Sequence, residues 1–203
     1  MNRDHPQPKI DPLRQVGGYF KETTWARGRL SRMTSEADEP RRDLFLRDGL
    51  EAADVVRVHR EALRVLRDSI ETAHLDAYSD SAWPREVEPE YEQVLSMAAN
   101  EVAEGVRSAK NDPGMGIDVD VREDTQFDVL LALAPYTIHA EAWRQGRKIF
   151  SASDTGTALW IAVTSEQEVR LMSRLGVLGV PQSAFTTQPR KWRSLFTWRS
   201  PTR

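Results

Sequence analysis

The stretch TIHAEAWRQGRKIFSASDTGTALWIAV, residues 137–163, decides the fold because its apolar and polar side chains alternate with a period of two. This period is typical of β-strands that are covered on one face only. Gln145-Gly146 and Asp154-Thr155-Gly156 interrupt the alternation, and both are short enough for hairpin turns. With two similar segments upstream, the sequence predicts an antiparallel meander of about five strands. Their ranges are 117–122, 127–134, 137–144, 147–152 and 157–163.

A helix is predicted directly after the last strand, over 164–176. Thr164 or Ser165 can cap its N-terminus, and Glu168 would close a Ser-x-x-Glu capping box. Gly176 can end it. These signals place one capped helix after the sheet.

Helical spacing is also present before the predicted strands. Apolar residues recur in steps of three and four over 43–77, and again from Tyr91 to Ala109. The loop 78–89 lies between the two segments, and NDPGMG (111–116) ends the second. We therefore predict an α+β fold: an N-terminal helical hairpin packed on the antiparallel meander, followed by the capped C-terminal helix and a basic tail.

The charge of the chain is uneven along its length. Residues 1–34 carry seven basic and three acidic side chains, whereas 176–203 carry five basic and none acidic. The net charge of the whole chain is −3, so the middle is strongly acidic. We divide the chain into a basic arm and linker, a helical hairpin, a sheet with its helix, and a basic aromatic tail. The boundaries are 1–42, 43–110, 111–185 and 186–203, with the hairpin and sheet in one globular domain.

The two faces of the predicted sheet differ in chemistry. One is almost wholly aliphatic and must pack on helices. With the shortest turns, Glu141 would lie opposite Phe150, and Phe150 opposite Trp160. The second face would then combine three large aromatic side chains with a group of carboxylates, which is unusual for a face in water.

One interpretation of the second face is a divalent-metal hydrolase or nuclease. In the predicted register Asp120 lies opposite Asp128, and facing carboxylates repel unless a cation or a proton lies between them. Asp118 and Glu141 would complete an oxygen-rich set for Mg²⁺ or Mn²⁺, and His139 could add an imidazole. No established metal or nucleophile motif accompanies these residues.

A second interpretation is a non-enzymatic protein-binding module, and this is the function that we expect from the sequence. Trp143, Phe150 and Trp160 would be the anchors, and the acidic body would attract a basic partner. Inhibitors, antitoxins, chaperones and assembly components have this profile, and the partner could be a second copy of the chain. A third interpretation is that part of the chain itself covers these aromatic side chains. Within the tail the anchors would be Trp192, Phe196 and Trp198.

Nucleic-acid binding through the basic termini is a further alternative, with phosphate contacts from the tail. The tail residues concerned are Arg190, Lys191, Arg193 and Arg199. The acidic body would repel polyanions, and a weak contact with a membrane surface meets the same objection. The sequence has no cysteine, no apolar leader and no apolar run of membrane-spanning length. We therefore expect a cytoplasmic protein without a cofactor.

Overall fold

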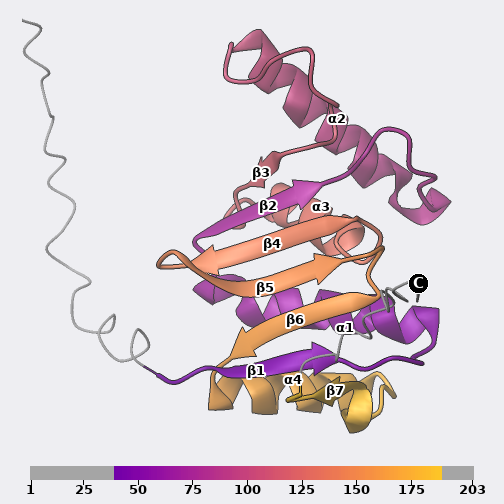
Figure 1. Cartoon of the computed structure of the whole chain (residues 1–203), viewed down its shortest axis with the longest axis vertical. Helices are drawn as coiled ribbons and strands as arrows, with labels where there is room; N and C mark the ends of the chain where they lie inside the picture. The colour runs from indigo at the N-terminus through magenta and orange to yellow at the C-terminus, as the bar shows by residue number, and fades with distance from the viewer. Residues whose placement is uncertain (1–38, 189–203) are drawn as a thin grey trace, which may run out of the picture. The chain divides into compact units, whose positions relative to one another are not determined.

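A computed structural model describes residues 39–188, and within this range the chain forms one seven-stranded sheet in which every pair of neighbours is antiparallel (Figure 1). The strand order is β3-β2-β4-β5-β6-β1-β7. The strands are β1 (Arg42–Leu46), β2 (Thr72–Asp76), β3 (Ile117–Val119), β4 (His139–Arg144), β5 (Arg147–Ser153), β6 (Ala158–Val163) and β7 (Phe185–Thr186). The prediction of mixed helix and antiparallel sheet is confirmed.

Four α-helices accompany the sheet in the described range: α1 (Ala52–Leu66), α2 (Glu88–Ala103), α3 (Asp124–Leu133) and α4 (Ser165–Val177). Three short 3₁₀ turns lie at Arg67–Ser69, Arg85–Val87 and Gln182–Ala184. Helices α1, α3 and α4 lie behind the sheet in the view of Figure 1, and α2 packs on α3 and β3 at one edge. Within residues 39–188 no helix covers the opposite face, which we call the open face. None of the helices described is both long and apolar enough to cross a bilayer.

The hydrophobic core lies between the sheet and these helices. Alternate residues of the strands point into it, such as Leu75 of β2 and Ile161 of β6, and both are fully buried. Leu63 of α1 and Leu171 of α4 meet them from the helical layer. The sheet thus has one apolar and one polar face, as predicted. Several of the strands and helices differ from the predicted ones.

The predicted strand 127–134 is wrong, because these residues form most of α3. Its sequence FDVLLALA is apolar at nearly every position, and periodicity cannot distinguish a short buried helix from a buried strand. The predicted helical hairpin is also wrong, since β2 lies between α1 and α2 and β1 precedes α1. Strand β2 buries Ala73 and Leu75, but Ala73 also follows Ile70 by three residues and precedes Ala77 by four. These three buried apolar residues fit a helical spacing that runs across the strand.

The three central strands β4, β5 and β6 are consecutive, as predicted, but their register is not the predicted one. Glu141 lies opposite Ser151, and Ser151 opposite Trp160. The β4–β5 pairing shifts at a bulge between Ala142 and Trp143, and a one-residue shift moves side chains to the other face. Phe150 therefore points into the core.

Helix α4 confirms the capped helix that the sequence predicts. The cap is Thr164, whose hydroxyl accepts a hydrogen bond from the backbone N–H of Gln167 at 3.2 Å. The side-chain oxygen of Gln167 accepts one in return from the N–H of Thr164 at 3.1 Å. Gln167 rather than Glu168 therefore closes the capping box.

His59 of α1 is fully buried, and this predicts a specific loss of stability in acid. Its Nδ1 lies 2.8 Å from the carbonyl oxygen of Val55, whereas Nε2 is buried with no hydrogen-bond partner. Burial lowers the pKa of His59 to about 4, against the smaller opposite effect of the Val55 hydrogen bond. Between pH 6.5 and 4 the unfolded chain therefore binds a proton that the folded chain does not. His59 should therefore lower the free energy of unfolding by about 2 kcal/mol when the pH falls from 7 to 4.5.

The measurement is urea unfolding of the full chain at these two pH values, with His59→Leu as the comparison. On acidification the free energy of unfolding of the variant should fall by about 2 kcal/mol less than that of the wild type, because the variant has no imidazole at position 59 to protonate. Equal losses in the two proteins would mean that His59 does not contribute to acid sensitivity.

Candidate metal site on the open face

The candidate site is a block of four side chains on neighbouring strands of the open face. His74 and Asp76 are two residues apart on β2, and His139 and Glu141 are two apart on β4. Residues two apart on a strand point to the same face. The register places His74 opposite Glu141 and Asp76 opposite His139. The intervening Leu75 and Ala140 are buried in the core, which fixes the polar four on the other side.

Asp76 lies between the two imidazole rings. His74 Nε2 is 3.2 Å from Asp76 Oδ1, and His139 Nδ1 is 3.3 Å from Asp76 Oδ2. One possible ligand atom from each of His74, Asp76 and His139 lies within 4.8 Å of the other two. Ligand atoms of a tetrahedral zinc site, about 2.0–2.1 Å from the ion, are about 3.3–3.4 Å apart. The His–Asp separations are therefore close to those that an ion would require.

Each ring also faces a second carboxylate with its other nitrogen. His139 Nε2 is 3.0 Å from Glu141 Oε1, and His74 Nδ1 is 3.6 Å from Asp118 Oδ1 across β2 and β3. Glu141 is only 8% exposed and is contacted by the ammonium of Lys148 and by Ser151 Oγ at 3.4 Å. Burial alone would raise the pKa of Glu141, but the hydrogen bond and charge of Lys148, with His139, hold it below the usual value. Glu141 is thus an ionised carboxylate that can accept a hydrogen bond from the Nε2–H of His139.

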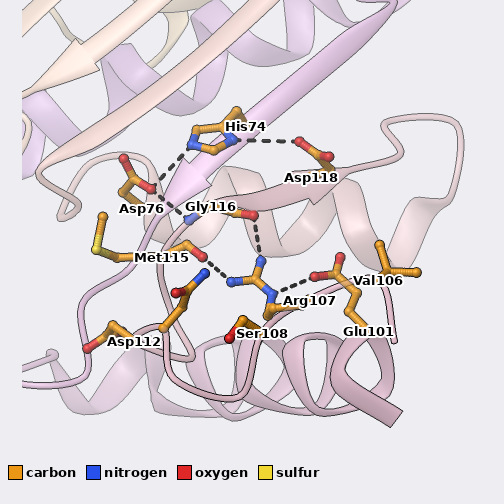
Figure 2. Close-up of a pocket in the computed structure, with 11 residues that line it drawn as sticks. His74, Asp76, Glu101, Val106, Arg107, Ser108, Asp112, Met115, Gly116 and Asp118 are labelled. Atoms are coloured by element: carbon orange, nitrogen blue, oxygen red, sulfur yellow. Dashed lines mark hydrogen bonds and ion pairs between the residues drawn. The ribbon is translucent and has the colours of Figure 1, made fainter. Parts of the chain in front are cut away.

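The loop from α2 to β3 holds Asp76 from the other side. The backbone N–H of Gly116 donates to Asp76 Oδ1 at 2.8 Å. Gly114 packs so closely on Ala77, the residue directly after β2, that a Cβ at Gly114 would lie 1.5 Å from the Ala77 carbonyl oxygen. Arg107 fixes the same loop, since it donates to the carbonyl oxygens of Met115 and Gly116 and pairs with Glu101 (Figure 2). The carboxylate is therefore positioned by backbone as well as by the rings.

A cleft of about 730 Å³ opens between this loop and the sheet (Figure 2). His74, Asp76 and Asp118 line it from the strands, and the remaining wall comes from α2 and the loop. Those residues are Glu101, Val106, Arg107, Ser108, Asn111, Asp112, Met115 and Gly116. A ligand in the cleft would lie beside two of the three candidate metal ligands.

The structure brings together only some of the carboxylates predicted as a metal site. Asp118, His139 and Glu141 do meet around the cluster, but Asp120 and Asp128 do not join them. Asp120 lies in the turn after β3 and accepts from the N–H of Arg122 at 3.0 Å, and Asp128 is exposed on α3. The predicted facing pair is wrong because it depended on a strand where α3 forms.

The sequence analysis missed His74 and Asp76. Residues 72–76 were assigned to the predicted helix, where His74 and Asp76 would diverge rather than share a face. A signal was present: His-x-Asp at 74–76 and His-x-Glu at 139–141 both place two polar groups on one face of a strand.

The predicted aromatic anchors separate into three groups. Trp143 and Trp160 are half-buried on the open face, and Phe45 of β1 lies opposite Trp160. Phe150 is fully buried in the core, so its place on the open face is wrong. Trp192, Phe196 and Trp198 lie outside the described residues, as do the basic residues Arg190, Lys191, Arg193 and Arg199.

Comparisons of this chain with models of protein families, with curated proteins and with solved structures found no match.

Proposed function

We propose that the protein binds one divalent transition-metal ion of the zinc type through His74 Nε2, His139 Nδ1 and the Asp76 carboxylate. The observation that carries the proposal is the orientation of both rings. Each presents one nitrogen to Asp76 and the other to a second carboxylate. Metal-bound histidines commonly have this arrangement, since the outer carboxylate fixes the tautomer and makes the ring a better ligand. Two imidazoles with one carboxylate favour zinc, iron or nickel over magnesium.

The chemistry that such a site supports best is hydrolysis. Three protein ligands leave a coordination position for water, and a bound zinc ion would lower the pKa of that water to about 7. The chain itself would supply the rest. Glu141 and Asp118 hold the rings, the Gly116 N–H orients Asp76, and the cleft gives a substrate access. This proposal keeps the metal-hydrolase interpretation and its His139, but replaces the predicted carboxylate ligands with Asp76 and adds His74.

Calorimetric titration of the full chain, freed of metal with a chelator, tests the proposal. We expect one equivalent of Zn²⁺ to bind and Mg²⁺ to give no comparable heat, because magnesium prefers an all-oxygen shell. Zn²⁺ at 100 times its dissociation constant should add about 2.7 kcal/mol to the free energy of unfolding. The absence of both heat and stabilisation with Zn²⁺, Mn²⁺, Fe²⁺ and Ni²⁺ would refute the metal site.

A second proposal concerns the other half of the open face, where Phe45 and Trp160 lie side by side on β1 and β6. We propose that they bind a basic, aromatic protein segment. Residues 39–188 carry 26 acidic and 16 basic side chains, which favours a basic partner. The sequence 189–203 has this chemistry, with five basic and no acidic side chains.

A synthetic peptide of residues 189–203, titrated into a chain that ends at Gln188, tests the second proposal. Binding should weaken as salt is raised and fall about tenfold or more in Trp160→Ala, since aromatic anchors dominate such contacts. Val169→Ala, which removes an exposed apolar side chain of α4, is the control. Binding that is absent at low salt, or unaffected by Trp160→Ala, would refute it.

A further inference from the structure

We infer that the cleft beside the proposed metal site accepts ligands that carry a positive charge on an alkyl arm, such as the side chain of a basic peptide, and disfavours oxyanions such as phosphate esters. This inference rests on the proposed metal function and names the class of ligand that reaches the ion. The inference depends on two observations: the cationic side chain of the cleft is already paired, and carboxylates of the cleft are accessible to solvent.

The cationic side chain that lines the cleft is not free to bind an anion. The side chain of Arg107 is only 9% exposed, and its Nε donates to Glu101 Oε2 at 2.7 Å. Its two terminal nitrogens donate to the carbonyl oxygens of Gly116 and Met115. An anion would have to break the loop that holds Asp76 in order to use this guanidinium. Arg107 therefore shapes the cleft without making it attractive to phosphate.

Carboxylates line the same cleft and are accessible in part. Asp76, Glu101, Asp112 and Asp118 all contribute. Glu101 is neutralised by Arg107. Asp112 accepts hydrogen bonds from Ser79 and Gly114 but has no cationic partner within residues 39–188, whereas the side chain of Asp118 is 91% exposed. A neighbouring cleft of about 570 Å³ shares Glu101 and Asp118 and is lined by two further acids, Glu71 and Asp120, with Arg122 as its cation. Even with a divalent ion bound at Asp76, the accessible end of the cleft is negative. A ligand whose metal-binding group is followed by a cation meets this charge favourably.

The remaining wall suits an alkyl arm between the two charged ends. Val106 is 77% exposed at the cleft, and Ser108 and Asn111 add uncharged polar groups to its lining. A lysine-like side chain can lay its methylene groups on such a surface while its ammonium reaches the carboxylates. Figure 2 shows Val106 and Ser108 on the side of the cleft opposite His74.

Three compounds that share a metal-binding hydroxamate group but differ in the charge of their tails test this inference. With the Zn²⁺-loaded full chain we expect lysine hydroxamate to bind about tenfold or more tightly than acetohydroxamate. We expect the anionic monohydroxamate of glutaric acid to bind about tenfold or more weakly. If Zn²⁺ binds but the three hydroxamates bind equally, in the reverse order or not at all, the inference is wrong and the metal site stands. If Zn²⁺ does not bind, both are wrong.

A substitution that adds a positive charge to the wall of the cleft, and leaves the metal ligands unchanged, gives a second test. Asn111→Lys adds a cation to an exposed residue of the cleft and should reduce the preference for lysine hydroxamate at least severalfold, while Zn²⁺ affinity stays the same. Val169→Lys adds the same charge on α4, outside the lining of the cleft, and should leave the preference unchanged. An equal change in the two variants would show that the preference comes from the overall charge and would refute the role of the cleft.

Discussion

Replacing His139 with alanine should raise the dissociation constant for Zn²⁺ by on the order of 100-fold or more, without unfolding the protein. Removing a partner outside the coordination sphere of a metal site already costs about 10–100-fold in affinity, and removal of a ligand should cost at least the upper value. His139 is 37% exposed in its side chain and lies on the open face, so its loss leaves no cavity in the core. Calorimetry measures the affinity, and the far-ultraviolet circular dichroism spectrum checks the fold.

A graded series distinguishes coordination from a general loss of charge. His74→Ala should match His139→Ala, because each ring gives one nitrogen to the ion. Glu141→Gln should reduce affinity about 10–100-fold, since a neutral amide oxygen accepts from the ring of His139 more weakly than the carboxylate does. His5→Ala is the matched control, as it removes a histidine outside the described residues. If His74→Ala and His139→Ala bind Zn²⁺ as tightly as the control, these rings are not ligands.

The sequence predicted the elements whose signals are local. Strands β4, β5 and β6 follow a period of two over consecutive segments joined by short turns, and α4 begins at a capping box. Non-local pairing was not predictable in this way. Strand β1 pairs with β6 and with β7, more than 100 residues later in the chain, and no periodicity within five residues encodes that choice. Helix α3 was misread because every residue from 129 to 133 is buried, and such a continuous buried run removes the amphipathic pattern.

The candidate site shows the same limit. Half of it, His139 with Glu141, was found because both lie on a strand that was predicted correctly. The other half lies on β2, whose assignment to a helix separated His74 from Asp76. The bulge after Ala142 then decided which aromatic side chains share the open face, and a bulge has no sequence signal comparable to a turn.

Phe150→Ala should destabilise the protein by about 3–5 kcal/mol, the usual cost of removing a buried aromatic side chain. The side chain is fully buried between β4 and β6, opposite Ala142 and Ile161, so truncation leaves a cavity in the core. Trp160→Ala, on the neighbouring strand but on the open face, should cost less than about 2 kcal/mol because its ring is already partly in water.

Urea unfolding of the two variants compares the opposite interpretations of these aromatic residues. The sequence predicted both as anchors for a partner, and in that case the two truncations would destabilise the isolated chain similarly and weakly. The register of β5 instead requires Phe150→Ala to be the more destabilising by at least about 1 kcal/mol. If Trp160→Ala destabilises the isolated chain as much as Phe150→Ala, Trp160 is covered in solution and is not available to a partner.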